Sequence, residues 1–277
     1  MGQLKIEIRT SKFSLFDVYQ NDKLANPQSF IFQPSTYLKQ VQFEDLGLIP
    51  YREAWAYQEQ RHRELIQSKL DNRQRETPEY LPHRLIFCEH PPVYTLGKSG
   101  SADHLLLSEP ELAAAGFEYY KINRGGDITY HGPGQIVGYP IFDLDRFFTD
   151  VHRYVRHLEE AVIRTLAGYG LEAFRIKEYT GVWLEGKNGL PDRKICAIGV
   201  HLSRWVTLHG FAFNVNTQLS HFDNIVPCGI ADDHKTVTSM ARELGGPVDQ
   251  EAVKTQLKEH LAELFGFVFA PNEPKQT

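Results

Sequence analysis

A lysine at the start of a strand-like segment is the first residue whose type and place could do chemistry. The segment 194–202, KICAIGVHL, is typical of a β-strand, and a side-chain period of two puts Lys194 on the same side as Cys196 and Ile198. Because that side is apolar, we expect it to face the core, where burial disfavours the ammonium form of a lysine. The alternative is a lysine at a strand end whose charged tip returns to water.

A cysteine in a tight turn is the second candidate. Cys228 lies in NIVPCGIAD, where the flanking Pro227 and Gly229 predict a shaped turn beside free backbone N–H groups, as in an oxyanion hole. The alternative is a small apolar residue packed under a loop, which is common for free cysteines. Cys196 is a rival because it lies close to Lys194, although its apolar neighbours indicate packing, and Cys88 in RLIFCEH looks structural for the same reason.

A glycine-rich segment, RGGDITYHGPGQIVGYPI, is the third candidate. Gly125 and Gly126 permit close approach of the backbone to a ligand, and Arg124 and His131 could bind or polarise it. The alternative is an ordinary glycine-rich hairpin. The segment is not a P-loop, because no GK[ST] follows a GxxxxG spacing. The histidines elsewhere show no HExxH or comparable spacing, so we expect no metal.

The elements that must position these residues form a mixed pattern. Apolar periodicity and capping signals predict helices over 51–70 and 150–167, and another from the N-cap Asp249 to Gly266. Weak strands are expected at 5–9 and 30–32, and clearer ones at 84–90, 91–100, 127–131, 135–144, 178–186, 194–202 and 209–215. Strands and helices do not alternate strictly, so we predict an α+β domain with a mixed sheet flanked by helices. We expect one catalytic domain at 36–270, preceded by an extension at 1–35.

Composition excludes several classes of protein. A formal charge of −5 argues against general nucleic-acid binding, and no apolar run is long enough to cross a bilayer. The first residues mix charge with apolar side chains and lack the core of a signal peptide, so we expect a cytoplasmic protein. Three cysteines without a CxxC pair predict neither a disulfide framework nor a zinc ribbon.

Four segments in order carry a resemblance to a known family: HPPVYTLGKSG, RGGDITYHGPGQIVGYPIFDL, KICAIGVHLSRWVTLHGFAFNV and IVPCGI. Together they resemble the lipoyl(octanoyl) transferases, lipoate-biosynthesis enzymes that share the fold of biotin and lipoate protein ligases. The resemblance covers about residues 40–265, and its RGG–TYHGPGQ block is highly specific. Residues 1–35 lie outside it, GKNGLPDR before Lys194 is a local elaboration, and Cys196 stands where the family usually has an alanine-like residue.

The resemblance implies an activity, partners and site residues. It implies transfer of octanoyl from acyl carrier protein to the target lysine of lipoyl domains, which belong to the E2 subunits of 2-oxoacid dehydrogenases and to the glycine cleavage H protein. It implies a Cys228 thioester with Lys194 as partner, and no cofactor, membrane or nucleic acid. The implied substrate-binding residues are Arg124, Gly125, Gly126, Asp127, Ile128, Thr129, Tyr130, His131, Ala197, Ile198, Gly199, Gly210, Phe211 and Ala212.

Three other functions remain open at this point. An ATP-dependent lipoate or biotin ligase on the same fold would form an acyl-adenylate and would not need Cys228. A non-catalytic binder of lipoyl domains would not need the Lys194–Cys228 pair. A cysteine hydrolase would more usually pair its cysteine with a histidine, and it would have to admit water.

Overall fold

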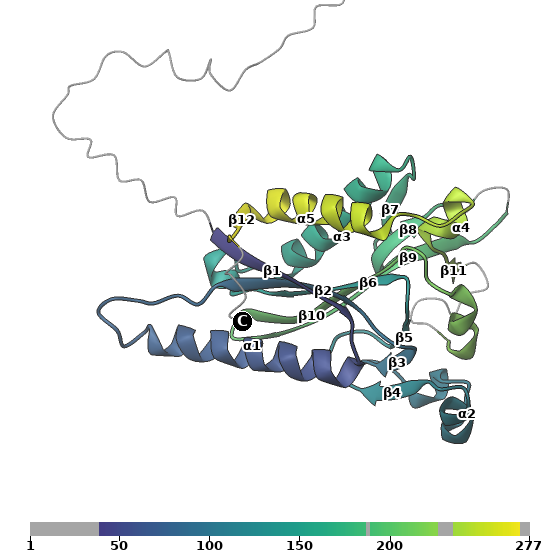
Figure 1. Cartoon of the computed structure of the whole chain (residues 1–277), viewed down its shortest axis with the longest axis horizontal. Coiled ribbons are helices and arrows are strands. Elements are labelled where there is room, and N and C mark those ends of the chain that lie inside the picture. Colours follow the sequence, from purple (N-terminus) through teal and green to yellow (C-terminus); the bar gives the residue numbers. More distant parts are fainter. Residues whose placement is uncertain (1–38, 187–188, 227–234, 272–277) are drawn as a thin grey trace, which may run out of the picture. The chain divides into compact units, whose positions relative to one another are not determined.

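The computed structural model describes residues 39–186, 189–226 and 235–271. A nine-stranded sheet runs through this part of the chain (Figure 1). Its strands lie in the order β12 (Phe267–Phe269), β1 (Lys39–Leu48), β2 (His83–Glu89), β6 (Gln135–Ile141), β10 (Val206–Asn214), β9 (Asp192–Ser203), β8 (Tyr179–Leu184) and β7 (Ala173–Ile176), while β11 (Lys235–Val237) also pairs with β9. The β1–β2, β1–β12 and β9–β11 pairs are parallel and the others antiparallel. The predicted mixed sheet is confirmed.

A smaller sheet and several helices complete the described chain. The small sheet has the order β4 (Glu118–Lys121), β3 (Val93–Leu96), β5 (Ile128–His131). The helices are α1 (Tyr51–Asp71), α2 (Glu109–Ala114), α3 (Val151–Gly168), α4 (Met240–Leu244) and α5 (Gln250–Phe265), with short 3₁₀ turns η2 (Ala102–His104), η3 (Leu144–Arg146) and η4 (Leu219–Asn224). None of the described helices has the length and apolar character needed to cross a membrane.

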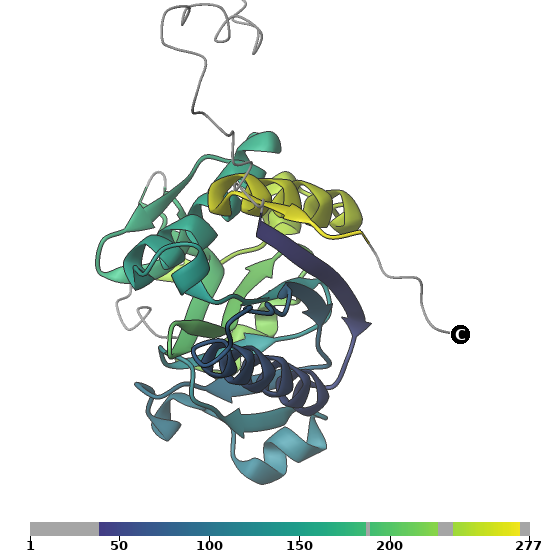
Figure 2. The same cartoon turned by 90° about the vertical axis from the view of Figure 1, so that its left-hand side faces the viewer.

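Helices cover both faces of the large sheet (Figures 1 and 2). On one face, α3 and α5 pack over a core that includes Phe87, Leu158 and Leu257, and on the other α1 packs over Ile86 and Leu208. Each helix therefore buries one face against the pleated surface, and the two cores enclose the sheet.

The three predicted helices are confirmed, and so are the predicted N-cap Asp249 and the end of the last helix at Gly266. The Asp150 side chain accepts from the Arg153 N–H at the start of α3, and Asp249 accepts from two backbone N–H groups at the start of α5, which ends at the left-handed Gly266. The apolar periodicity of α3 predicts one buried face made of Val151, Val155, Leu158, Val162 and Leu166. The prediction is only partly correct, because the last three are buried and Val155 is half-buried, whereas Val151 is exposed.

Several elements were not predicted. Strand β1 was missed although Val41 and Phe43 alternate with polar residues, and the other missed elements (α2, β4, β7, α4, β11 and β12) are short. The expected strands at 5–9 and 30–32, and the expected boundary between residues 35 and 36, lie outside the described residues, so these remain predictions.

Glycine lets two strands of the large sheet approach closely. A Cβ built on Gly210 would lie 2.0 Å from the Gly138 carbonyl oxygen and 2.8 Å from Pro140 Cδ, so no side chain fits between β10 and β6 at this point. Gly246, in contrast, follows α4 and has no atom within 4 Å of its built Cβ. The sheet therefore requires glycine at position 210 and not at position 246.

We expect Gly210→Ala to lower the free energy of unfolding by about 2–3 kcal/mol, because the new methyl group must push β6 and β10 apart. The matched variant Gly246→Ala should change it by less than about 0.5 kcal/mol. Urea denaturation measures both. Equal stabilities for the two variants would show that the strand contact tolerates a side chain.

Burial makes His83 sensitive to acid. The residue is 1% exposed, and burial, reinforced by the positive charges of Arg146 and Lys39, lowers its pKa to about 3. Its Nδ1 accepts from the Asp143 N–H at 3.2 Å. An unfolded histidine has a pKa of about 6.5. Between that pH and about pH 3, His83 therefore binds a proton in the unfolded chain but stays neutral in the folded chain. The contribution of neutral His83 to the free energy of unfolding is therefore complete above about pH 6.5 and is lost progressively as the pH drops toward about 3.

We expect His83→Asn to make the protein less sensitive to acid. Asparagine keeps an acceptor for the Asp143 N–H but cannot titrate. Between pH 7 and pH 5 the native protein should lose about 2 kcal/mol through His83 alone, and the variant should be spared that loss. Urea denaturation at both pH values gives the difference, and parallel pH dependences for the two proteins would contradict the assignment.

Candidate functional site

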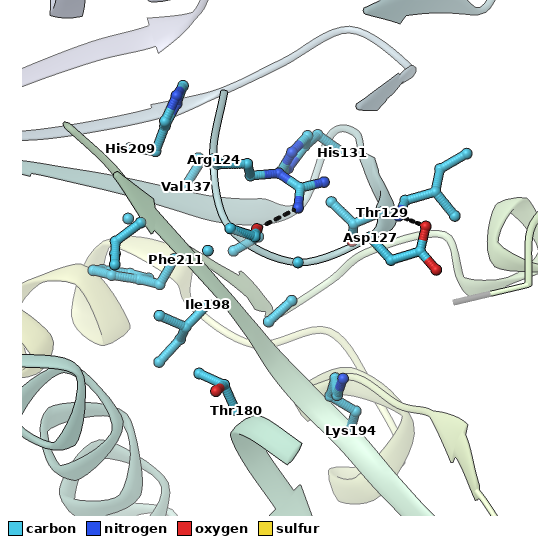
Figure 3. A pocket seen from close by; sticks show the side chains of 18 of the residues that line it. Arg124, Asp127, Thr129, His131, Val137, Thr180, Lys194, Ile198, His209 and Phe211 are labelled. Atoms are coloured by element: carbon cyan, nitrogen blue, oxygen red, sulfur yellow. Dashed lines mark hydrogen bonds between the residues drawn. The ribbon is translucent and has the colours of Figure 1, made fainter. Parts of the chain in front are cut away.

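A cavity of about 330 Å³ brings most of the predicted site residues together (Figure 3). Its lining comes from the segment 124–127, from strands β5, β6, β8, β9, β10 and β11, and from α1, α3 and η4. The predicted residues found in it are Arg124, Gly125, Gly126, Asp127, Ile128, Thr129, His131, Lys194, Ala197, Ile198, Gly199, Gly210, Phe211 and Ala212. Its volume falls within the ordinary range of small-molecule sites, about 300–1,000 Å³.

Tyr130 is placed elsewhere. Its ring packs against Tyr94 and Phe222 in a separate core cluster, with ring centroids 5.5 and 5.4 Å apart, and its hydroxyl lies 2.7 Å from His221 Nδ1. Strand β5 directs neighbouring side chains to opposite faces, so Thr129 and His131 share a face that Tyr130 does not. Tyr130 therefore supports the strand from behind.

The floor of the cavity consists of very small residues from two paired strands. In the β9–β10 register Ala197 lies opposite Ala212, and Gly199 lies opposite Gly210. All four line the cavity. Ala197 and Ala212 carry only a methyl group and so leave room for the cavity. The two glycines instead let neighbouring backbone come close, because a built Cβ would lie 2.7 Å from the Gly125 carbonyl oxygen at Gly199 and 2.0 Å from the Gly138 carbonyl oxygen at Gly210. We call these four residues the small-residue floor.

Arg124 is held in the cavity by oxygen atoms of neighbouring segments. It is 8% exposed, and its Nη2 donates to the Thr95 carbonyl at 2.6 Å and to Thr95 Oγ1 at 3.0 Å, while Nη1 donates to the Gly125 carbonyl at 3.0 Å. A buried guanidinium with this many acceptors has a defined orientation. Arg124 is thus fixed beside the two glycines that the sequence singled out.

His131 continues this hydrogen-bonded arrangement. Its Nε2 lies 3.2 Å from Thr95 Oγ1, and its Nδ1 lies 2.9 Å from Gln135 Oε1. Since the Gln135 amide nitrogen donates to the Tyr130 carbonyl and to Asn214 Oδ1, Gln135 Oε1 is the acceptor and His131 Nδ1 carries the proton. His131 Nε2 therefore accepts from the Thr95 hydroxyl.

Both carboxylate oxygens of Asp127 are engaged within the protein. Oδ1 accepts from the Ile128 N–H at 2.7 Å, and Oδ2 forms a close pair with His104 Nδ1. The residue is 6% exposed. This arrangement anchors the segment that begins strand β5 to the turn η2.

Burial keeps the imidazoles of the cavity uncharged at neutral pH. The pKa of His131 lies well below its ordinary value because of burial, with His90 and Arg124 adding to the effect. The pKa of His209 falls to about 3, again through burial first and Arg124 second. Both rings can therefore hydrogen-bond without carrying a charge.

Lys194 lines the cavity, but it does not share a face with Cys196 as the sequence predicted. The pairing of β8 with β9 shifts register beside Lys194, since Val182 lies opposite Cys196 while Trp183 lies opposite Lys194. Such a bulge breaks the alternation of side chains. Lys194 Nζ lies 4.6 Å from the centroid of the Trp183 ring, whereas Cys196 is buried in the core cluster under α3.

The two described cysteines are poor nucleophiles. Both are fully buried. Burial raises the pKa of Cys196, with the Glu159 carboxylate adding to the effect, and it raises the pKa of Cys88 well above the ordinary value, with Asp45 adding. The thiolate form is therefore disfavoured in each. Cys228 lies outside the described residues.

The residues that flank 227–234 meet the cavity and its lysine. Before this segment, Phe222 lines the cavity, and the Val226 N–H donates to the His104 carbonyl at 2.8 Å. After it, Val237 lines the cavity and pairs with Lys194 in the β11–β9 register, and the Thr238 N–H donates to the Lys194 carbonyl at 2.9 Å. Both flanks are thus tied to the walls of the site.

Sequence reasoning missed several residues of the site. The structure adds the following residues to the lining: Tyr51, Gln135, Val137, Tyr139, Val155, Glu178, Tyr179, Thr180, Val200, His209, Asn214, Phe222 and Val237. The sequence offers a signal for Gln135 and Asn214, because each is a polar residue at the end of a strand that is otherwise rich in buried apolar residues. Tyr51 and Val155 lie on helices distant in sequence, and no local pattern connects them with the cavity.

The sequence and the fold both match known proteins. Residues 50–262 match the family described as Lipoyl protein ligase A/B catalytic domain. The octanoyltransferase of Cytophaga hutchinsonii is 58% identical over 229 residues, covering 82% of this chain and 93% of that protein. The octanoyltransferase of Flavobacterium johnsoniae is 55% identical over 228 residues, covering 82% and 97%.

Solved structures show the same fold at low sequence identity. A bi-partite lipoate protein ligase from Thermoplasma acidophilum matches with a TM-score of 0.61 at 18% identity, covering 86% of this chain and 88% of that chain. A lipoate-protein ligase A bound with ATP matches with a TM-score of 0.59 at 16% identity, covering 86% and 90%. From the extent of the family match and the identity to its relatives, this chain belongs to the lipoyl protein ligase A/B catalytic domain family, as an acyltransferase of the octanoyltransferase type.

Proposed function

We propose that this protein transfers an octanoyl group from octanoyl-acyl carrier protein to the target lysine of lipoyl domains, through a thioester on Cys228 with Lys194 as its partner. The acceptors in this proposal are the lipoyl domains of 2-oxoacid dehydrogenase E2 subunits and the glycine cleavage H protein, and the location is the cytoplasm. The observation that carries the proposal is the placement of Lys194 in a cavity with Arg124 and the small-residue floor. The name of the relatives, octanoyltransferase, supports the acyl group.

The first step forms the thioester. The Cys228 thiolate attacks the carbonyl carbon of the carrier thioester, and the bond to the carrier sulfur breaks. Lys194 supplies a proton to the departing sulfur, so the products are the carrier thiol and octanoyl-Cys228. A lysine ammonium beside the cysteine favours the thiolate that begins this step.

The second step forms the amide. The amine of the acceptor lysine attacks the octanoyl-Cys228 carbonyl, the C–S bond breaks, and Lys194 takes the proton that the amine releases. A free lysine with a pKa near 10.4 is neutral in only about one molecule in 2,500 at pH 7, so a positioned base recovers much of that cost. An amide forms downhill from a thioester, and the proposed reaction therefore uses no ATP.

The apolar part of the cavity supports the choice of an acyl chain. Val137, Val155, Ile198 and Phe211 line it together with the small-residue floor. Burial of an octanoyl tail contributes roughly 5–6 kcal/mol at about 0.8 kcal/mol per methylene. This energy holds the tail while the carbonyl is presented to the nucleophile.

The first test is intact-protein mass spectrometry after mixing with octanoyl-loaded carrier protein in the absence of ATP. We expect an octanoyl adduct on the native protein and on Cys196→Ala, and none on Cys228→Ala. An adduct lost only in Cys196→Ala would move the nucleophile to the buried thiol. Product that appears only when ATP is added would replace the thioester route with an adenylate.

The second test concerns Lys194. We expect Lys194→Met to slow adduct formation by about 10²–10⁴-fold, because general acid–base catalysis contributes that much. Lys258→Met is the matched control, since Lys258 Nζ also lies over an aromatic ring, 3.9 Å from the Phe43 centroid, but lines no part of the cavity. Stopped-flow mixing followed by mass spectrometry gives the rates, and a Lys194→Met rate equal to that of the control would remove Lys194 from the mechanism.

A further inference from the structure

His209 has a backbone conformation that its place in a strand does not explain. Its φ is +62°, in the left-handed region that side-chain-bearing residues rarely adopt. Among the described residues, the other non-glycine residues with positive φ are Arg204 and Trp205, at the tip of the hairpin between β9 and β10, where such angles are expected. His209 instead lies within β10, paired with Val200. Strain of this kind is typical of functional sites.

The His209 side chain also uses only part of its hydrogen-bonding capacity among the described residues. The residue is 2% exposed, and its Nε2 lies 2.6 Å from Asn123 Oδ1, which makes Nε2 the donor. In the part of the chain that the structure describes, Nδ1 has no hydrogen-bond partner. A side chain selected for stability alone would combine neither a strained backbone nor an unpartnered buried nitrogen. The hydrogen bond from His209 Nε2 to Asn123 Oδ1 is the polar contact through which this imidazole can act on its surroundings.

Asn123 begins the loop that carries Arg124 and the two glycines, and this loop touches the large sheet beside His209. The Gly125 N–H donates to the carbonyl of Val200, the residue paired with His209, at 3.0 Å. A Cβ on Gly199 would lie 2.7 Å from the Gly125 carbonyl oxygen, so the loop rests directly on β9. The loop is therefore attached to the paired residues His209 and Val200 on both sides of Arg124. The Asn123 side chain makes the attachment before it, and the Gly125 N–H makes the one after it.

The other backbone hydrogen bonds of this loop lead away from the large sheet. The Lys98 N–H donates to the Arg124 carbonyl at 2.9 Å, and the Ser99 N–H donates to the Gly126 carbonyl at 3.2 Å. Residues 98 and 99 follow strand β3 of the small sheet. The His209–Asn123 and Val200–Gly125 hydrogen bonds thus determine how the loop is set over the cavity floor.

We propose that His209 is a positioning residue, which uses its left-handed backbone to place the imidazole against Asn123 and thereby holds the Arg124 loop over the small-residue floor. The consequence for acyl binding rests on the function proposed above, whereas the anchoring itself does not. In this arrangement His209 acts on the substrate through the loop. Its loss should loosen the loop and weaken binding of the acyl donor, while the chemistry at Lys194 is spared.

Hydrogen exchange followed by mass spectrometry tests the anchor on the protein alone. His209→Gly relieves the strained φ and removes the imidazole, and Asn123→Ala removes the acceptor. We expect peptides covering 123–127 to exchange at least about tenfold faster in both variants, with no further increase in the double variant, because both changes break the same contact. Unchanged exchange in His209→Gly, or additive effects in the double variant, would overturn the proposal.

Arg204→Gly is the matched control. It relieves a φ of +52° at the hairpin tip, and Arg204 is not part of the cavity lining. We expect native exchange at 123–127 in this variant, and an equal acceleration there would attribute the effect to general loosening of the β9–β10 hairpin and overturn the proposal.

Steady-state kinetics with octanoyl-loaded carrier protein tests the consequence for binding. We expect His209→Gly to raise KM by about 5- to 20-fold and to leave kcat within about twofold, the pattern of lost ground-state binding. A fall in kcat at constant KM would overturn the assignment to positioning. If the native protein shows no transfer, the proposed function fails, and the exchange experiment still decides whether His209 anchors the loop.

Discussion

A continuous series of hydrogen bonds joins the two halves of the site, and the relative positions of Arg124 and Lys194 depend on it. It runs from the Arg124 guanidinium to the Thr95 hydroxyl, on to His131 and then to the Gln135 amide. From Gln135 it continues through the Asn214 amide to the Thr238 carbonyl, and the Thr238 N–H donates to the Lys194 carbonyl. Each member is buried or half-buried, so an interruption would leave a polar group unpaired where water cannot replace it. The glycine loop and the lysine strand therefore hold a defined separation.

The buried polar groups of the cavity combine hydrogen bonding with imidazoles that carry no charge. His131 and His209 are neutral at pH 7 because burial and Arg124 oppose protonation. The Asp127 carboxylate is occupied by Ile128 and His104. In the proposed function, the charges on Cys228 and Lys194 would be little screened in such a setting, and their mutual effect would be stronger than in water.

The sequence predicted the regular parts of this structure well because their signals are local. The N-cap Asp249 and the apolar stripes of the helices depend only on neighbouring residues. Lys194 was assigned to a shared face with Cys196 because a period of two cannot reveal the register shift opposite Trp183, which arises from pairing between strands. Tyr130 is similar, since its hydroxyl meets His221 far along the chain. The left-handed His209 has no sequence signal, because glycine follows it rather than occupying its position.

The small-residue floor limits how the site can evolve. Gly199 and Gly210 already have the smallest side chain in the genetic code, and Ala197 and Ala212 the next smallest. Mutation can therefore raise the floor at either alanine, and it can lower the floor there only by the loss of one methyl group. A lineage that needs a shorter substrate could reach it by one substitution at Ala197 or Ala212, because a side chain at either glycine would meet backbone. A lineage that needs a longer substrate must remodel the walls at Val155, Ile198 or Phe211. Changes in substrate length are thus easier in one evolutionary direction than in the other.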